Sequence, residues 1–218
     1  MSAAADPVSY LTPIGRLSVL FVIAAEQEYG PALRATISAL VTGVGPVEAA
    51  AATASVLGAL GERGRAPDLV FSLGSAGSRT LEHAAIYQVA SVSYRDMDAT
   101  PLGFAKGVTP FLGEAAVATP PYRLRDIPVA SLATGAQIVT GARYDGIEAD
   151  MVDMETYAVL RAARRHRVPF VGLRGISDGR TELTGLPDWT AYLRQIDAKL
   201  ADAVRAFAGD VAAGRFQL

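Results

Sequence analysis

The sequence predicts a layered α/β fold with a largely parallel sheet. Short, continuous apolar runs, typical of strands buried on both faces, alternate along the chain with segments of helical periodicity. Half of the 218 residues are hydrophobic, which excludes an unfolded chain. A chain of this length usually forms one domain, so we assign residues 1–218 to a single domain whose first fifteen residues are expected to be flexible.

The first half of the chain is expected to contain four strands and two helices. Two helical turns fit residues 26–33. A longer helix should begin at Pro46, because proline suits the first turn of a helix and the run after it is rich in alanine. The glycine- and serine-rich sequence GSAGS is expected to end the third strand. The expected strands are 17–24, 37–42, 69–73 and 86–94.

The second half begins with a long segment, 97–127, that has prolines, scattered glycines and no clear period. We expect it to be irregular, and irregular segments of this length are usually functional or mobile. Three short strands and two helices should follow. The last helix is expected to run unbroken from Asp188 to about residue 208, because its apolar residues form one stripe. The expected elements before it are strands 129–133, 151–152 and 170–176 and helix 155–166.

Charge and composition exclude several classes of function. The formal net charge is −2, so no basic surplus is available to attract nucleic acid or an anionic membrane. The chain has no cysteine and only two histidines, so we expect no disulfide, no bound metal and no cofactor. The apolar run 17–25 is too short to span a bilayer. We interpret this run as a buried strand and expect a cytoplasmic protein.

Polar residues gather where several predicted strands end, which is where α/β sheets bind ligands. Glu26 and Glu28 follow the first strand, Asp153 and Glu155 lie between a strand and a helix, and Asp178 follows the last strand. Each feature also has a purely structural interpretation, since acids favour helix N-termini and Ser-Asp-Gly is a common turn. Taken together, these carboxylates indicate acid–base chemistry on a polar ligand.

Four segments, taken in order, carry a family resemblance: SLGSAGS, YRDMDATPLGF, VDMETYAV and VPFVGLRGISDG. They resemble the nucleoside phosphorylase/nucleosidase superfamily, and within it the 5′-methylthioadenosine/S-adenosylhomocysteine nucleosidases most closely. The resemblance extends from residue 17 to about 193. It implies a three-layer α/β/α sandwich with a twisted, mixed central sheet, and cleavage of the N-glycosidic bond of a purine nucleoside.

The resemblance also implies roles for individual residues. Asp178 would donate a proton to nitrogen 7 of the purine, Glu28 would activate a water molecule, and Arg174 would orient that water. Glu155 would hold the ribose hydroxyls, with Met154 against the sugar. The other binding residues implied are Ser177, Val139, Ile138, Ala76, Gly77 and Trp189, where Ile138 replaces an aromatic residue that usually stacks on the base.

Elementary chemistry supports this assignment. Cleaving a glycosidic bond builds positive charge on the sugar and negative charge on the leaving base, so an acid and an anion are both needed. An ordinary aspartic acid has a pKa of about 3.9, and it can donate a proton at neutral pH only if burial or a neighbouring anion raises that pKa. Asp178, Glu155 and Glu28, brought close together, would provide such a site.

Two alternatives to hydrolysis remain open: a phosphorylase of the same fold, and a nucleoside-binding protein without turnover. Phosphorylases of the superfamily usually carry an arginine where this chain has Ser72, which favours water as the nucleophile. We also expect a homodimer, because the apolar segment 101–112 lacks the helix that usually covers it. For Tyr94, Asp96 and Asp98, a role in the site or in a subunit contact and a role in simple loop packing are equally weighted.

Overall fold

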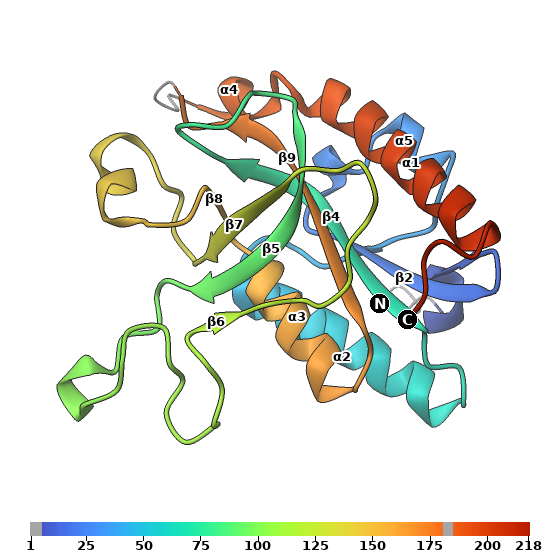
Figure 1. Cartoon of the computed structure of the whole chain (residues 1–218), viewed down its shortest axis with the longest axis horizontal. Helices are drawn as coiled ribbons and strands as arrows, with labels where there is room; N and C mark the ends of the chain where they lie inside the picture. Colours follow the sequence, from blue (N-terminus) through green and yellow to red (C-terminus); the bar gives the residue numbers. More distant parts are fainter. Residues whose placement is uncertain (1–5, 181–184) are drawn as a thin grey trace, which may run out of the picture.

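A mixed sheet of nine strands forms the centre of the molecule (Figure 1). The computed structural model describes residues 6–180 and 185–218. Parallel pairs join β2 to β3 and β4, β4 to β9, and β7 to β5 and β8, while the remaining pairs are antiparallel. The strands are β1 (Leu11–Ile14), β2 (Leu17–Ile23), β3 (Leu40–Val41), β4 (Leu69–Gly77), β5 (Ile86–Tyr94), β6 (Val117–Ala118), β7 (Val129–Thr134), β8 (Met151–Asp153) and β9 (Phe170–Asp178).

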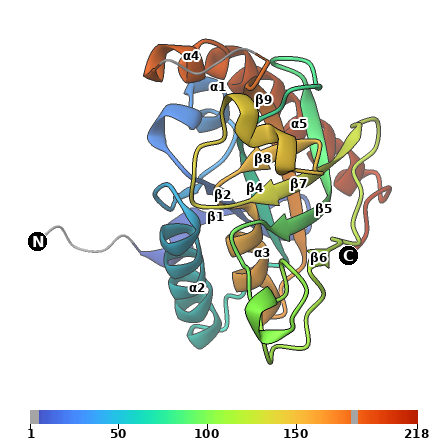
Figure 2. The same cartoon turned by 90° about the vertical axis from the view of Figure 1, so that its left-hand side faces the viewer.

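Helices cover the sheet on both faces, which confirms the three-layer α/β/α architecture (Figures 1 and 2). Helices α2 and α3 lie side by side on one face, and α1 and α5 pack on the other. The α-helices are α1 (Pro31–Arg34), α2 (Pro46–Glu62), α3 (Thr156–Arg165), α4 (Leu186–Thr190) and α5 (Leu193–Ala212). The 3-10 helices are η1 (Pro7–Tyr10), η2 (Glu26–Glu28), η3 (Thr100–Leu102) and η4 (Gly141–Gly146).

Strand β2 shows why the apolar runs are continuous. Its side chains alternate between the two faces of the sheet, and both faces are covered. Phe21 packs against Phe71 of β4 and the α5 side of the core, whereas Leu20 and Val22 belong to the core under α2 and α3. A strand in this position needs an apolar residue at nearly every step, and β2 has the sequence LSVLFVI.

Five of the strands close into a ring. Strand β4 pairs with β9, β9 with β5, β5 with β7, β7 with β8, and β8 returns to β4 at the pair Gly77 and Val152. Along the β4–β9 ladder, Gly74 is opposite Arg174 and Gly77 is opposite Asp178. The ring therefore gathers the ends of β4, β8 and β9 at one place.

Several element boundaries differ from the sequence prediction. Strand β4 does not stop at GSAGS but continues through it to Gly77, because β9 hydrogen-bonds to it along its whole length. The helical turns expected over 26–33 divide into η2 and α1, and the last helix is broken between Thr190 and Leu193. Strand β3 has only two residues, and β1, inside the segment expected to be flexible, pairs with β2.

A carboxylate from α5 holds the short helix α1 in place. The Asp197 side chain is buried and accepts hydrogen bonds from the backbone N–H groups of Ala32 (2.9 Å) and Leu33 (3.0 Å). These are first-turn amides that have no partner within their own helix. Gly30 permits the approach, because a Cβ there would meet the Asp197 carboxylate. Asp197 thereby fixes the segment that follows β2.

We expect Asp197→Ala to lower the free energy of unfolding by about 2–4 kcal/mol, because it leaves two amides without a charged acceptor in a buried place. Urea denaturation at neutral pH would measure the change. The matched control is Asp202→Ala on the exposed face of α5, whose ion pair with Arg205 is largely solvated and should contribute less than about 1 kcal/mol. Equal effects of the two substitutions would contradict the assigned role of Asp197.

Candidate active site

The strand ends surround a cavity of about 550 Å³. Eleven residues have a role implied by the family resemblance. Ten of them line the cavity, and the eleventh, Arg174, lines a smaller hollow next to it. The cavity has a polar inner end and an apolar mouth, where Val44, Ile138 and Leu186 are exposed. The singled-out residues in its wall are Glu28, Ala76, Gly77, Ile138, Val139, Met154, Glu155, Ser177, Asp178 and Trp189.

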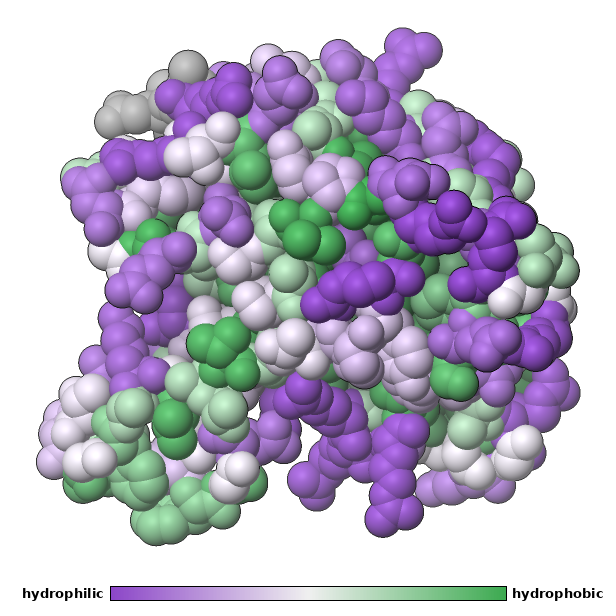
Figure 3. All heavy atoms as spheres, viewed as in Figure 1, coloured by the Kyte–Doolittle hydropathy of each residue, from purple (hydrophilic) through white to green (hydrophobic). Residues whose placement is uncertain are grey.

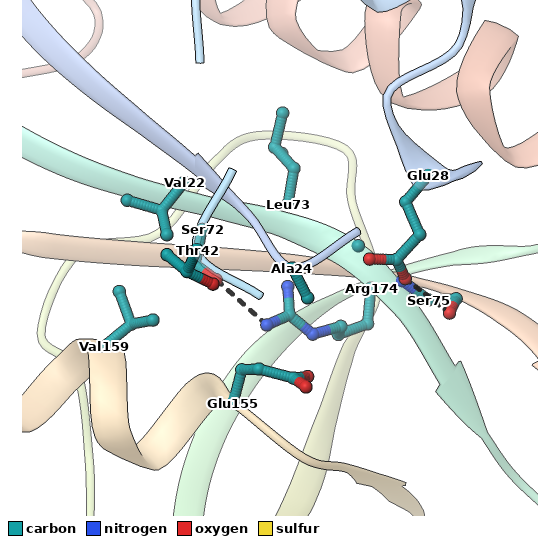
Figure 4. Close-up of a pocket in the computed structure, with 11 residues that line it drawn as sticks. Val22, Ala24, Glu28, Thr42, Ser72, Leu73, Ser75, Glu155, Val159 and Arg174 are labelled. Carbon is teal, nitrogen blue, oxygen red and sulfur yellow. Dashed lines mark hydrogen bonds between the residues drawn. The ribbon is translucent and has the colours of Figure 1, made fainter. Parts of the chain in front are cut away.

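Glu28 lies in η2, immediately after β2, and its carboxylate is buried against β4. Its Oε1 accepts hydrogen bonds from the backbone N–H and the hydroxyl of Ser75, both at 2.6 Å (Figure 4). Its Oε2 is buried with no hydrogen-bond partner among the described residues. Burial raises the pKa of Glu28, and the Ser75 hydrogen bonds and the charge of Arg174 oppose that rise. Glu28 therefore has one oxygen fixed and one oxygen ready to accept a proton.

Arg174 is buried in the middle of β9 and pairs with Asp153, with Nε at 3.1 Å from the carboxylate. Its Nη2 donates to the hydroxyls of Ser72 (2.9 Å) and Thr156 (2.6 Å), and its Nη1 donates to the Leu173 carbonyl oxygen (2.8 Å). A guanidinium has five N–H groups, so one on Nη1 has no partner among the residues that the structure describes.

A small hollow of about 10 Å³ joins Arg174 to the two nearest glutamates (Figure 4). Glu28, Glu155 and Arg174 all line it, together with Thr42 and Ser72. A space of this size holds about one water molecule, and a water there would find two carboxylates and a guanidinium as partners. The hollow thus combines a place for water with a group that can take its proton.

Glu155 lies at the N-terminus of α3, directly after β8, and faces both the hollow and the large cavity. Its Oε1 accepts a hydrogen bond from the Gly45 N–H at 2.7 Å. Gly45 has a φ of +100°, a conformation that favours glycine, and it precedes α2. Burial, followed by the charge of Asp153, raises the pKa of Glu155 to about 7. Met154 precedes Glu155 in the cavity wall.

Asp178 ends β9 at the inner end of the cavity. Its Oδ1 accepts a hydrogen bond from the Ser177 hydroxyl at 2.5 Å. Burial raises the pKa of Asp178, while the Ser177 hydrogen bond and the charge of His83 lower it. The direction of the net shift is the one that a proton donor at neutral pH requires.

The remaining predicted residues complete the wall between the carboxylates and the mouth. Ala76 and Gly77 end β4 beside Asp178, and Val139 is buried in the segment between β7 and η4. Ile138 is 62% exposed and leaves the cavity open on that side. Trp189, in α4, donates from its indole N–H to the Ser75 hydroxyl at 3.1 Å, the same hydroxyl that donates to Glu28.

Three further residues near the site have roles that sequence reasoning did not identify: it missed Arg95 and Tyr144, and it grouped Asp153 with the acids expected to act on the ligand. Arg95, after β5, lines the cavity and donates to four carbonyl oxygens, those of Ala133, Gly135, Gln137 and Asp153, which fixes the loop after β7. Asp153 is structural: it pairs with Arg174 and accepts from the Thr156 N–H at the start of α3. The third is Tyr144, whose buried hydroxyl has no partner among the described residues. No local sequence signal identifies these roles.

The three residues that the sequence left undecided lie outside the cavity wall described here. Tyr94 stacks on Tyr157 with ring centroids 5.3 Å apart, so it packs in the core. Asp96 accepts from the backbone N–H of Ala136, and Asp98 accepts from Thr100. All three act in packing or loop conformation within this chain.

No metal cluster is found in the parts of the chain that the structure describes, since no three His, Asp or Glu side chains there are grouped closely enough to hold an ion. A search of the helices in residues 6–180 and 185–218 finds none long and apolar enough to cross a membrane.

Comparison with known proteins finds relatives of both the sequence and the fold. The model of the phosphorylase superfamily matches residues 27–209. A 5′-methylthioadenosine/S-adenosylhomocysteine nucleosidase of Anoxybacillus flavithermus is 32% identical over 163 residues, which cover 66% of this chain and 68% of the relative. The corresponding protein of Actinobacillus succinogenes is 30% identical over 64% of this chain and 66% of the relative.

Solved structures show the same fold. The futalosine hydrolase of Helicobacter pylori superimposes with a TM-score of 0.73 at 18% identity, covering 88% of this chain and 97% of that one. A 5′-methylthioadenosine/S-adenosylhomocysteine nucleosidase of Neisseria meningitidis, in complex with methylthio-immucillin-A, gives a TM-score of 0.70 at 22% identity, covering 89% and 98%. The chain therefore has the fold of these nucleosidases over nearly their whole length.

The raised pKa of Glu155 predicts how stability depends on pH. An acid whose pKa rises from 4.5 to about 7 on folding binds its proton more tightly in the folded protein. The free energy of unfolding should therefore fall as pH rises from 4.5 to 7. Glu155→Gln removes this ionisation and should flatten the dependence by about 2 kcal/mol. Urea denaturation at pH 5 and pH 7.5 tests this, with the exposed Glu62→Gln as the control that should change nothing.

Proposed function

Because the chain belongs to the phosphorylase superfamily, we propose that it is a nucleosidase that hydrolyses the N-glycosidic bond of an adenine nucleoside and releases the free base. The substrates we propose are 5′-methylthioadenosine and S-adenosylhomocysteine, on which the named relatives act. The matched region spans about two thirds of those relatives. The cytoplasmic location expected from the sequence belongs to the same proposal, since residues 17–23 are used as the buried strand β2.

One observation carries the proposal: a proton donor, Asp178, and a proton acceptor, Glu28, face the same cavity near the end of β4. Glu28 is hydrogen-bonded to Ser75 of β4, and Asp178 lies beside Gly77, two residues further along that strand. Two residues of a strand span about 7 Å. A sugar ring and an attacking water fit between an acid and a base at such a spacing.

The chemistry follows from this placement. Asp178 gives its proton to a nitrogen of the purine as the bond between that base and the sugar breaks, and the bonding electrons leave with the base. The sugar carbon becomes positively charged, and the carboxylates of Glu155 and Glu28 stabilise it. Water attacks the same carbon from the hollow, and Oε2 of Glu28 accepts its proton. Glu155 also binds the ribose hydroxyls, where a carboxylate is a strong acceptor.

The surroundings of Ser72 favour water over phosphate. An arginine is usual at this position in phosphorylases, but here the buried serine accepts a hydrogen bond from Arg174. The hollow beside it has room for about one water molecule, far less than a phosphate needs. A phosphate would also lie beside the Glu28 carboxylate, and two unit charges 4 Å apart repel by about 4 kcal/mol at an effective dielectric of 20.

We expect Asp178→Asn to reduce kcat on 5′-methylthioadenosine by a factor of 10² to 10⁴, the usual contribution of a general acid. The amide keeps the shape of the side chain but cannot supply the proton. Release of free adenine, followed by its absorbance or by chromatography, measures the rate. Asp202→Asn on the exposed face of α5 is the control. Activity of Asp178→Asn within about threefold of the wild type would remove Asp178 from this role.

The sugar product distinguishes the three candidate functions. We expect the rate of 5′-methylthioadenosine turnover to be the same with and without millimolar phosphate, because water is the nucleophile. The sugar product should be free 5-methylthioribose in both cases. A sugar 1-phosphate, or turnover that needs phosphate, would instead identify a phosphorylase. Tight nucleoside binding without release of base would identify a binding protein, although a binding protein has no need for both the Asp178 donor and the Glu28 acceptor.

We further propose that the protein works as a homodimer. The segment 101–112 forms an apolar lobe that projects from the molecule (Figures 1 and 3). Leu102 is 74% exposed and Phe111 is 91% exposed, and Phe104 contacts the edge of the Phe111 ring. Glu114 ties the lobe to α3 through ion pairs with Arg161 and Arg164. A fixed, exposed apolar surface of this kind is typical of a subunit interface.

A second copy of the chain should therefore bury the lobe. Light scattering at micromolar concentration should give the mass of a dimer for the wild type, and Phe111→Asp together with Leu102→Asp should give a monomer. Val129→Asp places a charge at a 54% exposed valine outside the lobe and should leave the dimer intact. A monomeric wild type would contradict the proposal.

A further inference from the structure

We propose that Tyr144 is a positioning residue for the general acid: its hydroxyl donates a hydrogen bond to the Asp178 carboxylate when Asp178 gives its proton to the base. The inference rests on the proposed function of Asp178. It assigns a role to a residue that does not lie at the end of a strand and does not line the cavity.

The Tyr144 side chain is packed in a buried position, and its hydroxyl has no partner among the described residues. The residue lies in η4 and is only 8% exposed, packed with Ala133, Val139 and Val152. Its hydroxyl is buried and makes no hydrogen bond to any described residue. Burying a hydroxyl without a partner costs about 1–3 kcal/mol, so an unpaired group in this position calls for an acceptor that becomes available during the reaction.

The acceptor in reach is Asp178. A Cβ on Gly77 would overlap the Tyr144 hydroxyl and lie 2.9 Å from Oδ2 of Asp178, so both atoms border the space beside this one glycine. Oδ1 of Asp178 already accepts from the Ser177 hydroxyl. None of the described residues donates to Oδ2. The missing side chain of Gly77 thus lets an unpaired donor and an unpaired acceptor oxygen approach each other.

The charges around Asp178 and Tyr144 determine which of the two residues gives up its proton. Asp178 faces His83 from the segment before β5 as well as Tyr144 from η4. Tyr144 also faces Arg95, and Arg79 lies 5.5 Å from its ring centroid. Burial, followed by the Asp178 charge, raises the pKa of the phenol. Tyr144 therefore keeps its proton throughout the reaction and acts only as a donor.

The proton count of the step is simple. Before the reaction Asp178 is protonated and needs no strong donor. When its proton passes to the purine nitrogen, a carboxylate is left in a partly dry place, and a hydrogen bond from a rigid phenol stabilises that carboxylate more than it stabilises the acid. The Tyr144 hydroxyl therefore favours the transition state and the product over the ground state.

The variant Tyr144→Phe deletes the hydroxyl and keeps the ring that packs on Val139 and Val152. Losing a donor to the ionised form raises the pKa of Asp178. The alkaline limb of the kcat/KM profile, where activity falls as pH rises, should therefore move to higher pH by about one pH unit. The value of kcat at the pH optimum should fall about tenfold. Tyr122→Phe, which loses a phenol hydroxyl at a distance from the cavity, is the matched control and should match the wild type.

A second measurement does not need turnover. Carbon-13 in the aspartate carboxyls reports the ionisation of Asp178 directly, with Asp178→Asn identifying its signal, and Tyr144→Phe should move that titration upward. In the unaltered protein, carbon-13 at the hydroxyl-bearing carbon of Tyr144 should titrate together with Asp178. This second signal tests the contact even if Tyr144→Phe fails to fold.

The outcomes separate this inference from the proposed function. If the wild type releases base but both the pH profile and the carboxyl titration are unchanged in Tyr144→Phe, the tyrosine proposal is wrong and the nucleosidase proposal stands. An increase in KM with an unchanged profile would mean that Tyr144 contacts the substrate instead. If the wild type has no activity but the two titrations are coupled, the contact is real and the assigned reaction is wrong. In the Asp178→Asn background, Tyr144→Phe should have no further effect.

Discussion

The buried ion pair between Arg174 and Asp153 is the interaction on which the site depends. It joins the middle of β9 to the end of β8, and Arg174 also donates to Ser72 of β4 and Thr156 of α3. Asp153 in turn fixes the first turn of α3, which sets the position of Glu155. Removing one partner of such a pair leaves an uncompensated charge and typically costs about 3–5 kcal/mol. The same arginine that holds the strands together also lines the water-sized hollow.

The sequence is sufficient to predict the layers and most elements of the fold. Strands β2 and β5 and helix α2 follow from patterns that are local: an apolar run, and a proline before a run of alanines. The errors occur where long-range pairing overrides local preference. GSAGS has the composition of a loop, but β9 lies alongside it and makes it the end of β4. The break between α4 and α5 interrupts a continuous apolar stripe and lets Trp189 reach Ser75.

The candidate site divides in the same way. Asp178, Glu155 and Glu28 are predictable for two reasons. Acids at strand ends converge in an α/β sheet, and the sequence motifs that contain these acids resemble those of a known family. The sequence also singles out Asp153, but the structural roles of Arg95, Asp153 and Tyr144 are not predictable, because they depend on contacts between residues far apart in the chain. Tyr144 reaches the neighbourhood of Asp178 only because position 77 has no side chain, and a glycine in a Gly-Ser-rich segment does not indicate which hydroxyl will approach it.

The balance of charge in the cavity explains why this arrangement suits glycosidic cleavage. Asp153 already neutralises Arg174, which among the described residues is the only guanidinium that lines the hollow. The described residues therefore do not fully compensate the negative charges of Glu28 and Glu155. That is unfavourable in the free protein. Burial is the main cause of the raised pKa values of Glu28, Glu155 and Asp178, and the charge of Asp153 raises the pKa of Glu155 further. A positively charged sugar supplies the missing compensation, but only as the bond to the base breaks. Interactions that strengthen at that moment lower the barrier, whereas equal binding of substrate and transition state does not. The stability given up by burying carboxylates in the free protein thus becomes stabilisation of the transition state.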